Sequence, residues 1–163
     1  MNRSTANIPD VQGSQDFDAK IVPGHRVASG GNNDPRFPGG TIRMQIPHFK
    51  DLGIDLTPFY PGTINVGIAP RVYQVVSAPY TFRDVRWHPE EPAEDFSFFD
   101  VELLADDNES VIAAGLIYHP HPDTKPEHFQ KPDVLELLLP YVEGIAYGRT
   151  LRLRTRKSQI LIA

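Results

Sequence analysis

Proline and glycine recur so often along this sequence that a long helix has no room to form. The 163 residues include 16 prolines and 12 glycines. Proline removes a backbone donor and breaks a helix interior, and both residue types are typical of turns. The segments between them are short, and many show apolar alternation. Many short strands separated by turns are typical of a barrel, so we expect a mainly β fold with one or two short helices.

Charge and composition argue against several classes of protein. The formal net charge is −5, whereas a polyanion-binding chain usually carries a basic excess, so we expect no nucleic-acid partner. The chain has no cysteine, which removes disulfides, thiolate nucleophiles and Cys-ligated metals. No apolar run approaches the roughly 20 residues that span a bilayer, and residues 1–4 do not open a signal peptide. We therefore expect a cytoplasmic protein with no membrane partner.

The chain is expected to divide into a tail and one domain. Residues 1–20 are polar and lack periodicity, which predicts a loose tail, and residues 21–163 are expected to form a single domain. Turns and apolar patterns predict strands at Val22–Gly31, Thr41–Ile46, Ile64–Ile68, Val72–Val76, Tyr80–Trp87, Phe96–Leu104, Ser110–Tyr118, Arg149–Thr155 and Gln159–Ile162.

Four further local predictions complete this pattern. Asp106, Asp107 and Asn108 predict a hairpin between the strands that flank them, and the last two strands are predicted to form a second hairpin. Residues 48–53 are predicted to form one helical turn that Gly53 ends. Residues 134–142 (VLELLLPYV) fit either a strand or a helix, interrupted by a proline.

The run Pro61-Gly62-Thr63-Ile64-Asn65 is the most distinctive local feature. Residues two apart in a strand share a face, so the Thr63 hydroxyl and the Asn65 amide would project together. Two neutral oxygen ligands of this kind could help to hold a hydrated Mg²⁺ together with substrate phosphates. The simpler interpretation of these residues alone is a Pro-Gly turn followed by a strand whose asparagine meets solvent.

A proline- and histidine-rich loop carries a second group of possible ligands. His119 and His121 would lie on one side of a strand end, near Asp123, and His128 could fold back as a third ligand, as in catalytic zinc sites. That arrangement predicts a metal-dependent hydrolase. The alternative is an extended loop with solvated or hydrogen-bonded histidines, which is favoured because a flexible loop holds ligands poorly.

Three segments together resemble the archaeal CTP-dependent riboflavin kinases. Residues 61–66 (PGTINV) are similar to the PGTLN signature of that family. Residues 24–30 (GHRVASG) resemble its opening GxVxSG strand and glycine loop, and residues 133–138 (DVLELL) resemble its acidic-apolar strand. The resemblance extends from about residue 24 to residue 153, and PGTIN is its specific part.

The resemblance implies a six-stranded cradle-loop barrel that transfers the γ-phosphate of CTP or ATP to the ribityl hydroxyl of riboflavin or a similar small molecule. It implies that Thr63 and Asn65 bind Mg²⁺ and phosphates, and that Glu136 accepts the hydroxyl proton, as a carboxylate does in phosphoryl transfer. Without the resemblance, Glu136 would be interpreted as a surface glutamate. Further nucleotide-binding candidates are Ser29, Gly30, Gly31, Arg36 and Gly62.

The segment after Ser29 and Gly30 departs from the family pattern. Backbone amides of glycine loops cradle phosphates, but residues 31–40 (GNNDPRFPGG) include two prolines that lack an N–H. Arg36 could bind an anion in this segment. The alternative function is therefore a non-catalytic flavin- or nucleotide-binding protein of the same fold.

Overall fold

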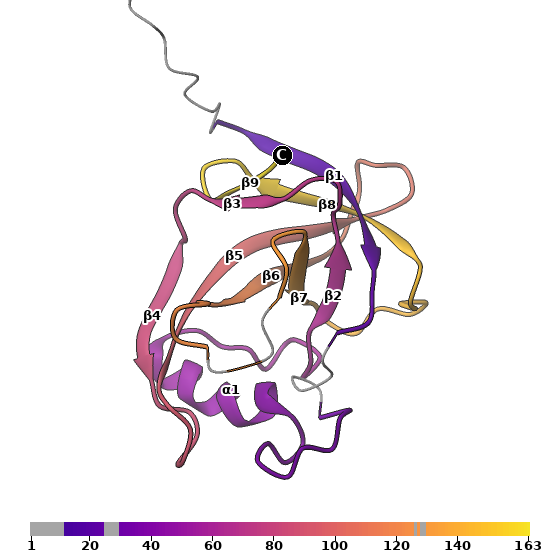
Figure 1. Ribbon diagram of the computed structural model, residues 1–163. Coiled ribbons are helices and arrows are strands. Elements are labelled where there is room, and N and C mark those ends of the chain that lie inside the picture. The colour runs from indigo at the N-terminus through magenta and orange to yellow at the C-terminus, as the bar shows by residue number, and fades with distance from the viewer. Residues whose placement is uncertain (1–11, 25–29, 126, 128–129) are drawn as a thin grey trace, which may run out of the picture.

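The computed structural model describes residues 12–24, 30–125, 127 and 130–163. Six antiparallel strands close into a barrel, as expected for a mainly β protein, and one short helix packs against its outside (Figure 1). No helix among the described residues is long and apolar enough to cross a bilayer. The barrel strands are β1 (Ser14–Ile21), β2 (Ile64–Gly67), β5 (Glu94–Leu104), β6 (Val111–Pro120), β7 (Val134–Leu138) and β8 (Thr150–Arg156).

The barrel runs in the order β5-β6-β7-β2-β1-β8 and closes through the pairing of β8 with β5. The long strand β5 serves two partners on the same edge. Its second half pairs with β8, and its first half continues beyond the barrel to pair with β4 (Tyr80–Val85). The two remaining strands, β3 (Tyr73–Val75) and β9 (Ile160–Ile162), pair with each other at the end of the molecule opposite the helix (Figure 1).

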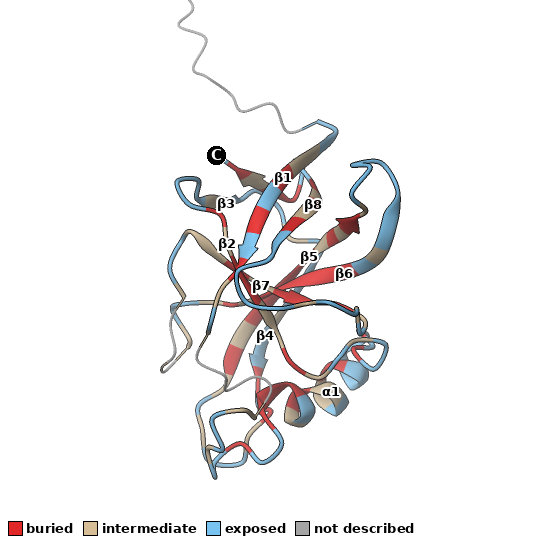
Figure 2. Ribbon diagram, turned by 90° about the vertical axis from the view of Figure 1, so that its right-hand side faces the viewer, coloured by how far each residue is buried: buried red, intermediate tan, exposed pale blue. Residues whose placement is uncertain are grey.

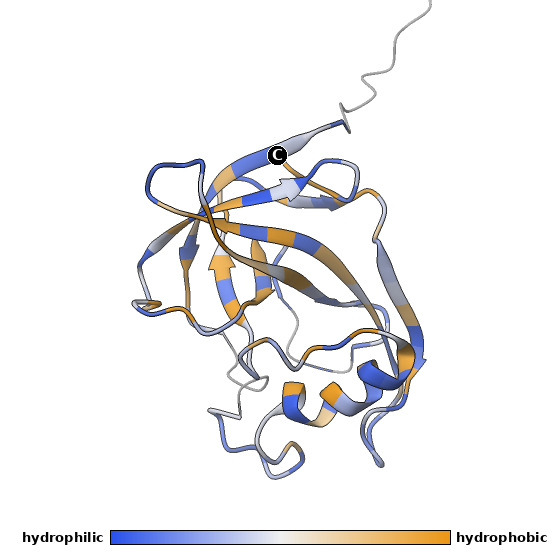
Figure 3. Cartoon of the chain, turned by 180° about the vertical axis from the view of Figure 1, so that it is seen from behind, coloured by the Kyte–Doolittle hydropathy of each residue, from blue (hydrophilic) through white to orange (hydrophobic). Residues whose placement is uncertain are grey.

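Apolar side chains fill the barrel because inward-facing and outward-facing residues alternate along its strands. Figure 3 shows this alternation as bands of opposite hydropathy, and Figure 2 shows the buried residues along the centre of β5, β6 and β7. Full burial of each such side chain stabilises the fold by about 1.5–3 kcal/mol. The largest members of this core that are almost fully buried are Phe17, Phe99, Ile117, Leu137, Leu139 and Leu153.

The helix α1 (Thr41–Leu52) builds a second core on the outside of the barrel. Its Phe49 ring packs edge-on against Phe96 and Phe98, with ring centroids 5.0 and 5.1 Å apart. The predicted strand at Thr41–Ile46 is therefore wrong. The buried positions Ile42, Gln45 and Phe49 follow the three-to-four residue period of a helix, which six alternating residues concealed. Gly53 ends the helix in a left-handed conformation, as predicted.

Strand β1 corrects the expectation of a loose tail over residues 1–20. From Ser14 onward the chain pairs with β8, and later with β2, and it buries Phe17 and Ala19. Residues 1–11 lie outside the described residues. The strand escapes notice in the sequence because its outward residues are charged. Asp16 and Asp18 form ion pairs with arginines at the directly opposite positions of the neighbouring strand β8. The strand predicted at residues 22–31 is also wrong in its described part, since residues 22–24 and 30–31 belong to no strand.

The remaining predictions for the second half of the chain have mixed outcomes. The hairpin around Asp106–Asn108 is confirmed, and it joins β5 to β6. The ambiguous segment at 134–142 forms strand β7 over its first five residues. The last two strands do not pair as a hairpin, because β8 pairs with β1 and β5 while β9 pairs with β3.

Candidate functional site

Strands β2 and β7 bring two of the predicted site residues side by side. They pair antiparallel with Asn65 directly opposite Glu136. Their chain neighbours Val66 and Leu135 point into the barrel core, so the Asn65 and Glu136 side chains project to the outer side of the wall. The sequence places these two residues far apart, and the barrel places them at adjacent positions on one face.

Thr63 joins the same group. It lies just before β2, and its hydroxyl donates a hydrogen bond of 3.2 Å to Oε1 of Glu136. Thr63 and Glu136 are both partly buried. Three oxygen-bearing side chains therefore meet on one face of the wall. The spacing of Thr63 and Asn65 predicted that these two would share a face.

The amide of Asn65 is buried and packs closely against Gly24. Asn65 is 9% exposed, and its Oδ1 is buried without a hydrogen-bond partner among the described residues. The amide lies against Gly24, where a Cβ atom would stand only 1.4 Å from Asn65 Nδ2. A buried oxygen without a donor costs roughly 1–3 kcal/mol unless something outside the described chain binds it.

This set of ligands fits a hard cation. The group offers one amide oxygen, one hydroxyl and one carboxylate, and Mg²⁺ prefers oxygen ligands from a few protein groups while keeping several waters. Asn65 and Thr63 are the residues that would hold it, with the Glu136 carboxylate beside them.

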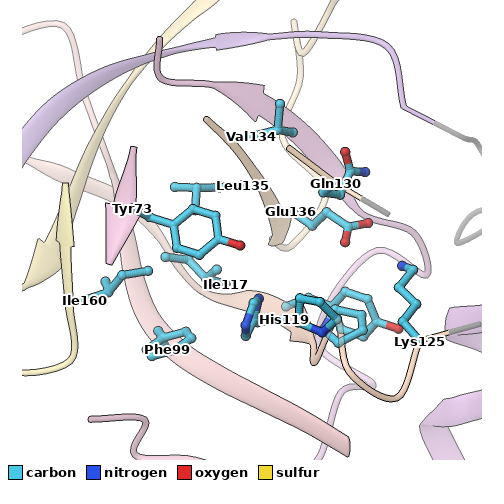
Figure 4. Close-up of a pocket in the computed structure, with 13 residues that line it drawn as sticks. Tyr73, Phe99, Ile117, His119, Lys125, Gln130, Val134, Leu135, Glu136 and Ile160 are labelled. Carbon is cyan, nitrogen blue, oxygen red and sulfur yellow. The ribbon is translucent and has the colours of Figure 1, made fainter. Parts of the chain in front are cut away.

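A small cavity opens next to Glu136, where β6 and β7 separate. Their pairing ends with Tyr118 opposite Glu136, and the two strands then diverge around a cavity of about 50 Å³. Figure 4 shows Tyr73, His119, Lys125 and Glu136 around this cavity. Apolar residues of the barrel core form its floor: Phe99, Ile117, Leu135 and Ile160.

The polar groups of the cavity are mostly uncharged. Burial lowers the pKa of His119 to about 4, with smaller contributions from the nearby His121 and Lys125, so this imidazole is neutral at pH 7. The His119 ring packs edge-on against Tyr73 at 5.7 Å. Burial, and then the negative charge of Glu136, raise the pKa of the Tyr73 hydroxyl, which keeps it a hydrogen-bond donor.

The histidines do not form the predicted metal centre within the described residues. His121 is hydrogen-bonded through Nε2 to the Ser97 hydroxyl at 2.6 Å, and Ser97 in turn contacts the Thr81 hydroxyl at 2.9 Å. His128 lies outside the described residues. Among the residues that the structure describes, no three His, Asp or Glu side chains gather as metal ligands.

The glycine-containing loop closes on itself. Gly30 adopts a left-handed conformation against Gly39 and Gly40, where a Cβ atom would stand 2.7 Å from the Gly40 nitrogen. Ser29 lies outside the described residues, and Gly31 is half-buried in the turn beside Gly30. Gly62 is buried at the turn before β2, with its N–H bonded to the Tyr60 carbonyl.

Arg36 is already engaged with acidic side chains. Its guanidinium contacts Asp34 at 2.8 Å, Glu91 at 3.4 Å and Glu127 at 2.5 Å. The Asp34 carboxylate is the main reason that the pKa of Arg36 is raised, ahead of the contribution from Glu127. A phosphate at this position would have to displace three carboxylates, so the geometry does not favour Arg36 as a free anion ligand.

Sequence reasoning missed three residues that line the cavity, namely Tyr73, Lys125 and Gln130. Tyr73 lies in a strand that was predicted, but nothing local marks it as facing a cavity. Lys125 and Gln130 lie in the histidine-rich loop, whose unusual length was the available signal for function.

Comparisons with known proteins assign this chain to no family. No protein-family model and no curated protein matches the chain.

Proposed function

We propose that this protein is a riboflavin-kinase-like phosphotransferase that moves the γ-phosphate of CTP or ATP to the ribityl hydroxyl of riboflavin or a similar small molecule. The observation that carries the proposal is the meeting of Thr63, Asn65 and Glu136 on one face of the β2–β7 wall. These are the residues that the resemblance to riboflavin kinases identifies. The six-stranded barrel and the adjacent cavity are consistent with that resemblance.

In this proposal, Glu136 acts as the base. Its carboxylate accepts the proton of the acceptor hydroxyl as the new oxygen–phosphorus bond forms, while the bond to the nucleoside diphosphate breaks and the diphosphate leaves. The Thr63 hydroxyl holds one oxygen of Glu136 and so orients the carboxylate. Asn65 would bind Mg²⁺ through its buried Oδ1. Bound Mg²⁺ supplies neutralisation of phosphate charge.

A second candidate is a flavin- or nucleotide-binding protein of the same fold without phosphotransferase activity. The observation in its favour is the loop at residues 30–40, in which two prolines lack an N–H and Arg36 is bound to three carboxylates. Phosphoryl transfer depends on positioning and charge neutralisation, and this loop supplies little free positive charge.

The experiment that separates the two candidates is direct. The purified protein is mixed with riboflavin, Mg²⁺ and either CTP or ATP, and FMN is measured by chromatography. FMN formation that is lost in Asn65→Ala and Glu136→Ala supports the kinase. Riboflavin binding with no FMN from either nucleotide supports the binding protein. Absence of both binding and turnover contradicts both candidates.

A further inference from the structure

One basic side chain, that of Lys125, is found among the described residues that line the cavity beside Glu136. Among its described lining residues, Lys125 is the only lysine or arginine, and His119 is neutral at pH 7. Figure 4 shows Lys125 and Glu136 on the same side of the cavity. A lysine ammonium is a compact point charge that commonly binds phosphate.

Lys125 stands on a turn that is fixed to the barrel. Its N–H bonds to the His121 carbonyl at 3.1 Å, which closes the turn. The Thr124 hydroxyl accepts a hydrogen bond of 2.8 Å from the Asp95 N–H of β5. The turn is therefore tied both to itself and to β5, so the lysine is presented at a defined position rather than from a free loop.

The charge of Lys125 is not consumed by an ion pair within the described part of the chain. Lys125 is only half-buried. Its charge acts on two nearby groups. It contributes to lowering the pKa of His119, and it opposes the rise in the pKa of Glu94 that burial causes. Arg36, in contrast, is held by three carboxylates.

We propose that Lys125 binds the phosphoryl group that is transferred, and so supplies the positive charge that the loop at residues 30–40 does not. This inference rests on the proposed function. The acceptor hydroxyl loses its proton to Glu136, its oxygen bonds to phosphorus, and the nucleoside diphosphate leaves with the electron pair of the broken bond. Lys125 neutralises the oxygens of the group in transit and exchanges no proton.

The kinetic test compares Lys125→Met and Lys125→Arg with the wild type. Removal of one preorganised group that stabilises transition-state charge lowers kcat by about 100- to 1,000-fold, so we expect that loss in Lys125→Met, unchanged riboflavin affinity and partial recovery in Lys125→Arg. The exposed Lys50→Met is the matched control, because it removes the same charge from the helix, at a residue that does not line the cavity. A Lys125→Met protein that keeps kcat within about threefold of the wild type overturns the role of Lys125.

A binding test separates this inference from the kinase proposal. Inorganic tripolyphosphate with Mg²⁺ is titrated calorimetrically into the wild type, Lys125→Met, Lys125→Gln and Lys50→Met. We expect at least tenfold weaker binding in both Lys125 variants alone, and thermal unfolding shows that each variant is folded. Lys125-dependent binding in a wild type that forms no FMN upholds the anion site and refutes the kinase. FMN formation that is unchanged in the Lys125 variants upholds the kinase and refutes the role of Lys125. A wild type that neither binds tripolyphosphate nor forms FMN overturns both proposals.

Discussion

The hydroxyl of Thr63 donates a hydrogen bond to Oε1 of Glu136 across 73 residues of sequence, at 3.2 Å. The bond exists because β2 and β7, distant in the chain, are neighbours in the barrel wall. It fixes the direction of a carboxylate that also lines a cavity. A general base must be held within hydrogen-bond reach of the proton that it removes, and this contact provides such a restraint.

Replacement of Glu136 by glutamine should greatly slow turnover while preserving the fold. Glutamine keeps the shape and still accepts the bond from Thr63, but it cannot accept a proton. We expect kcat for FMN formation to fall by about 100- to 10,000-fold, the usual contribution of a general base. The exposed Glu109→Gln serves as the control for loss of one negative charge. Equal kcat in Glu136→Gln and the wild type would show that this carboxylate is not the base.

Gly24→Ala should disturb Asn65 without unfolding the barrel. The new Cβ would stand 1.4 Å from Asn65 Nδ2, so the amide must rotate away from its position. A displacement of about 1 Å in a positioning group can cost about 100-fold in rate, and we expect a loss of FMN formation of that order. The free energy of unfolding should fall by about 1–3 kcal/mol, because Asn65 is nearly buried and its Cγ would also lie 2.6 Å from the new Cβ.

Gly67→Ala is the matched control for that variant. It lies on β2, where an added Cβ makes only an ordinary contact of 3.5 Å with Val22. Activity and urea unfolding are measured for both variants. Full activity in Gly24→Ala, or an equal loss in Gly67→Ala, would show that the position of the Asn65 amide is not important.

Local patterns predicted most of the barrel because a strand in its wall buries every second residue. The rule failed where other forces set the structure. The charged outward residues of β1 made it look like a tail, although they pair with Arg152 and Arg154 on β8. The segment at Thr41–Ile46 alternates by coincidence, and the residue that reveals its helix is Phe49, which lies beyond it.

Only part of the site could be predicted from the sequence. The spacing of Thr63 and Asn65 fixes their common face once a strand is assumed. That Asn65 lies opposite Glu136 is a non-local strand pairing, which no local sequence pattern predicts. The cavity arises because β6 and β7 separate beyond Tyr118, so Tyr73 and Lys125 become its lining only in the assembled barrel.

The buried pair of Tyr118 and Gln45 should show how the helix is attached to the barrel. The Tyr118 hydroxyl donates a hydrogen bond of 2.8 Å to Gln45 Oε1, and the two residues are 5% and 1% exposed. Tyr118→Phe leaves that oxygen without a donor, which should lower the free energy of unfolding by about 1–3 kcal/mol. The double variant Tyr118→Phe, Gln45→Leu should recover part of the loss in urea unfolding, because it removes both polar partners. If the double variant lost as much stability as the sum of Tyr118→Phe and the single variant Gln45→Leu, the pairing would be contradicted.

The carboxylate of Glu94 should make the fold less stable as the pH rises. Glu94 is 6% exposed, and burial raises its pKa above the ordinary value of 4.5, although the Trp87 indole donates a hydrogen bond of 2.9 Å to it. Lys125 opposes this rise and Glu91 adds to it. Because the pKa is higher in the folded protein, the native state binds more protons above pH 4.5, and this contribution to stability is lost as the pH rises through the folded pKa.

Glu94→Gln tests that sign. Glutamine can accept the same bond from Trp87 without a charge, so the variant should exceed the wild type in free energy of unfolding at pH 7, and the difference should shrink toward pH 4. Urea unfolding at pH 4, 5.5 and 7 measures this difference, with the exposed Glu90→Gln as the control. A wild type more stable than Glu94→Gln at pH 7 would show that the charged form of Glu94 is favoured in the folded protein, and that Lys125 and Trp87 outweigh the cost of its burial.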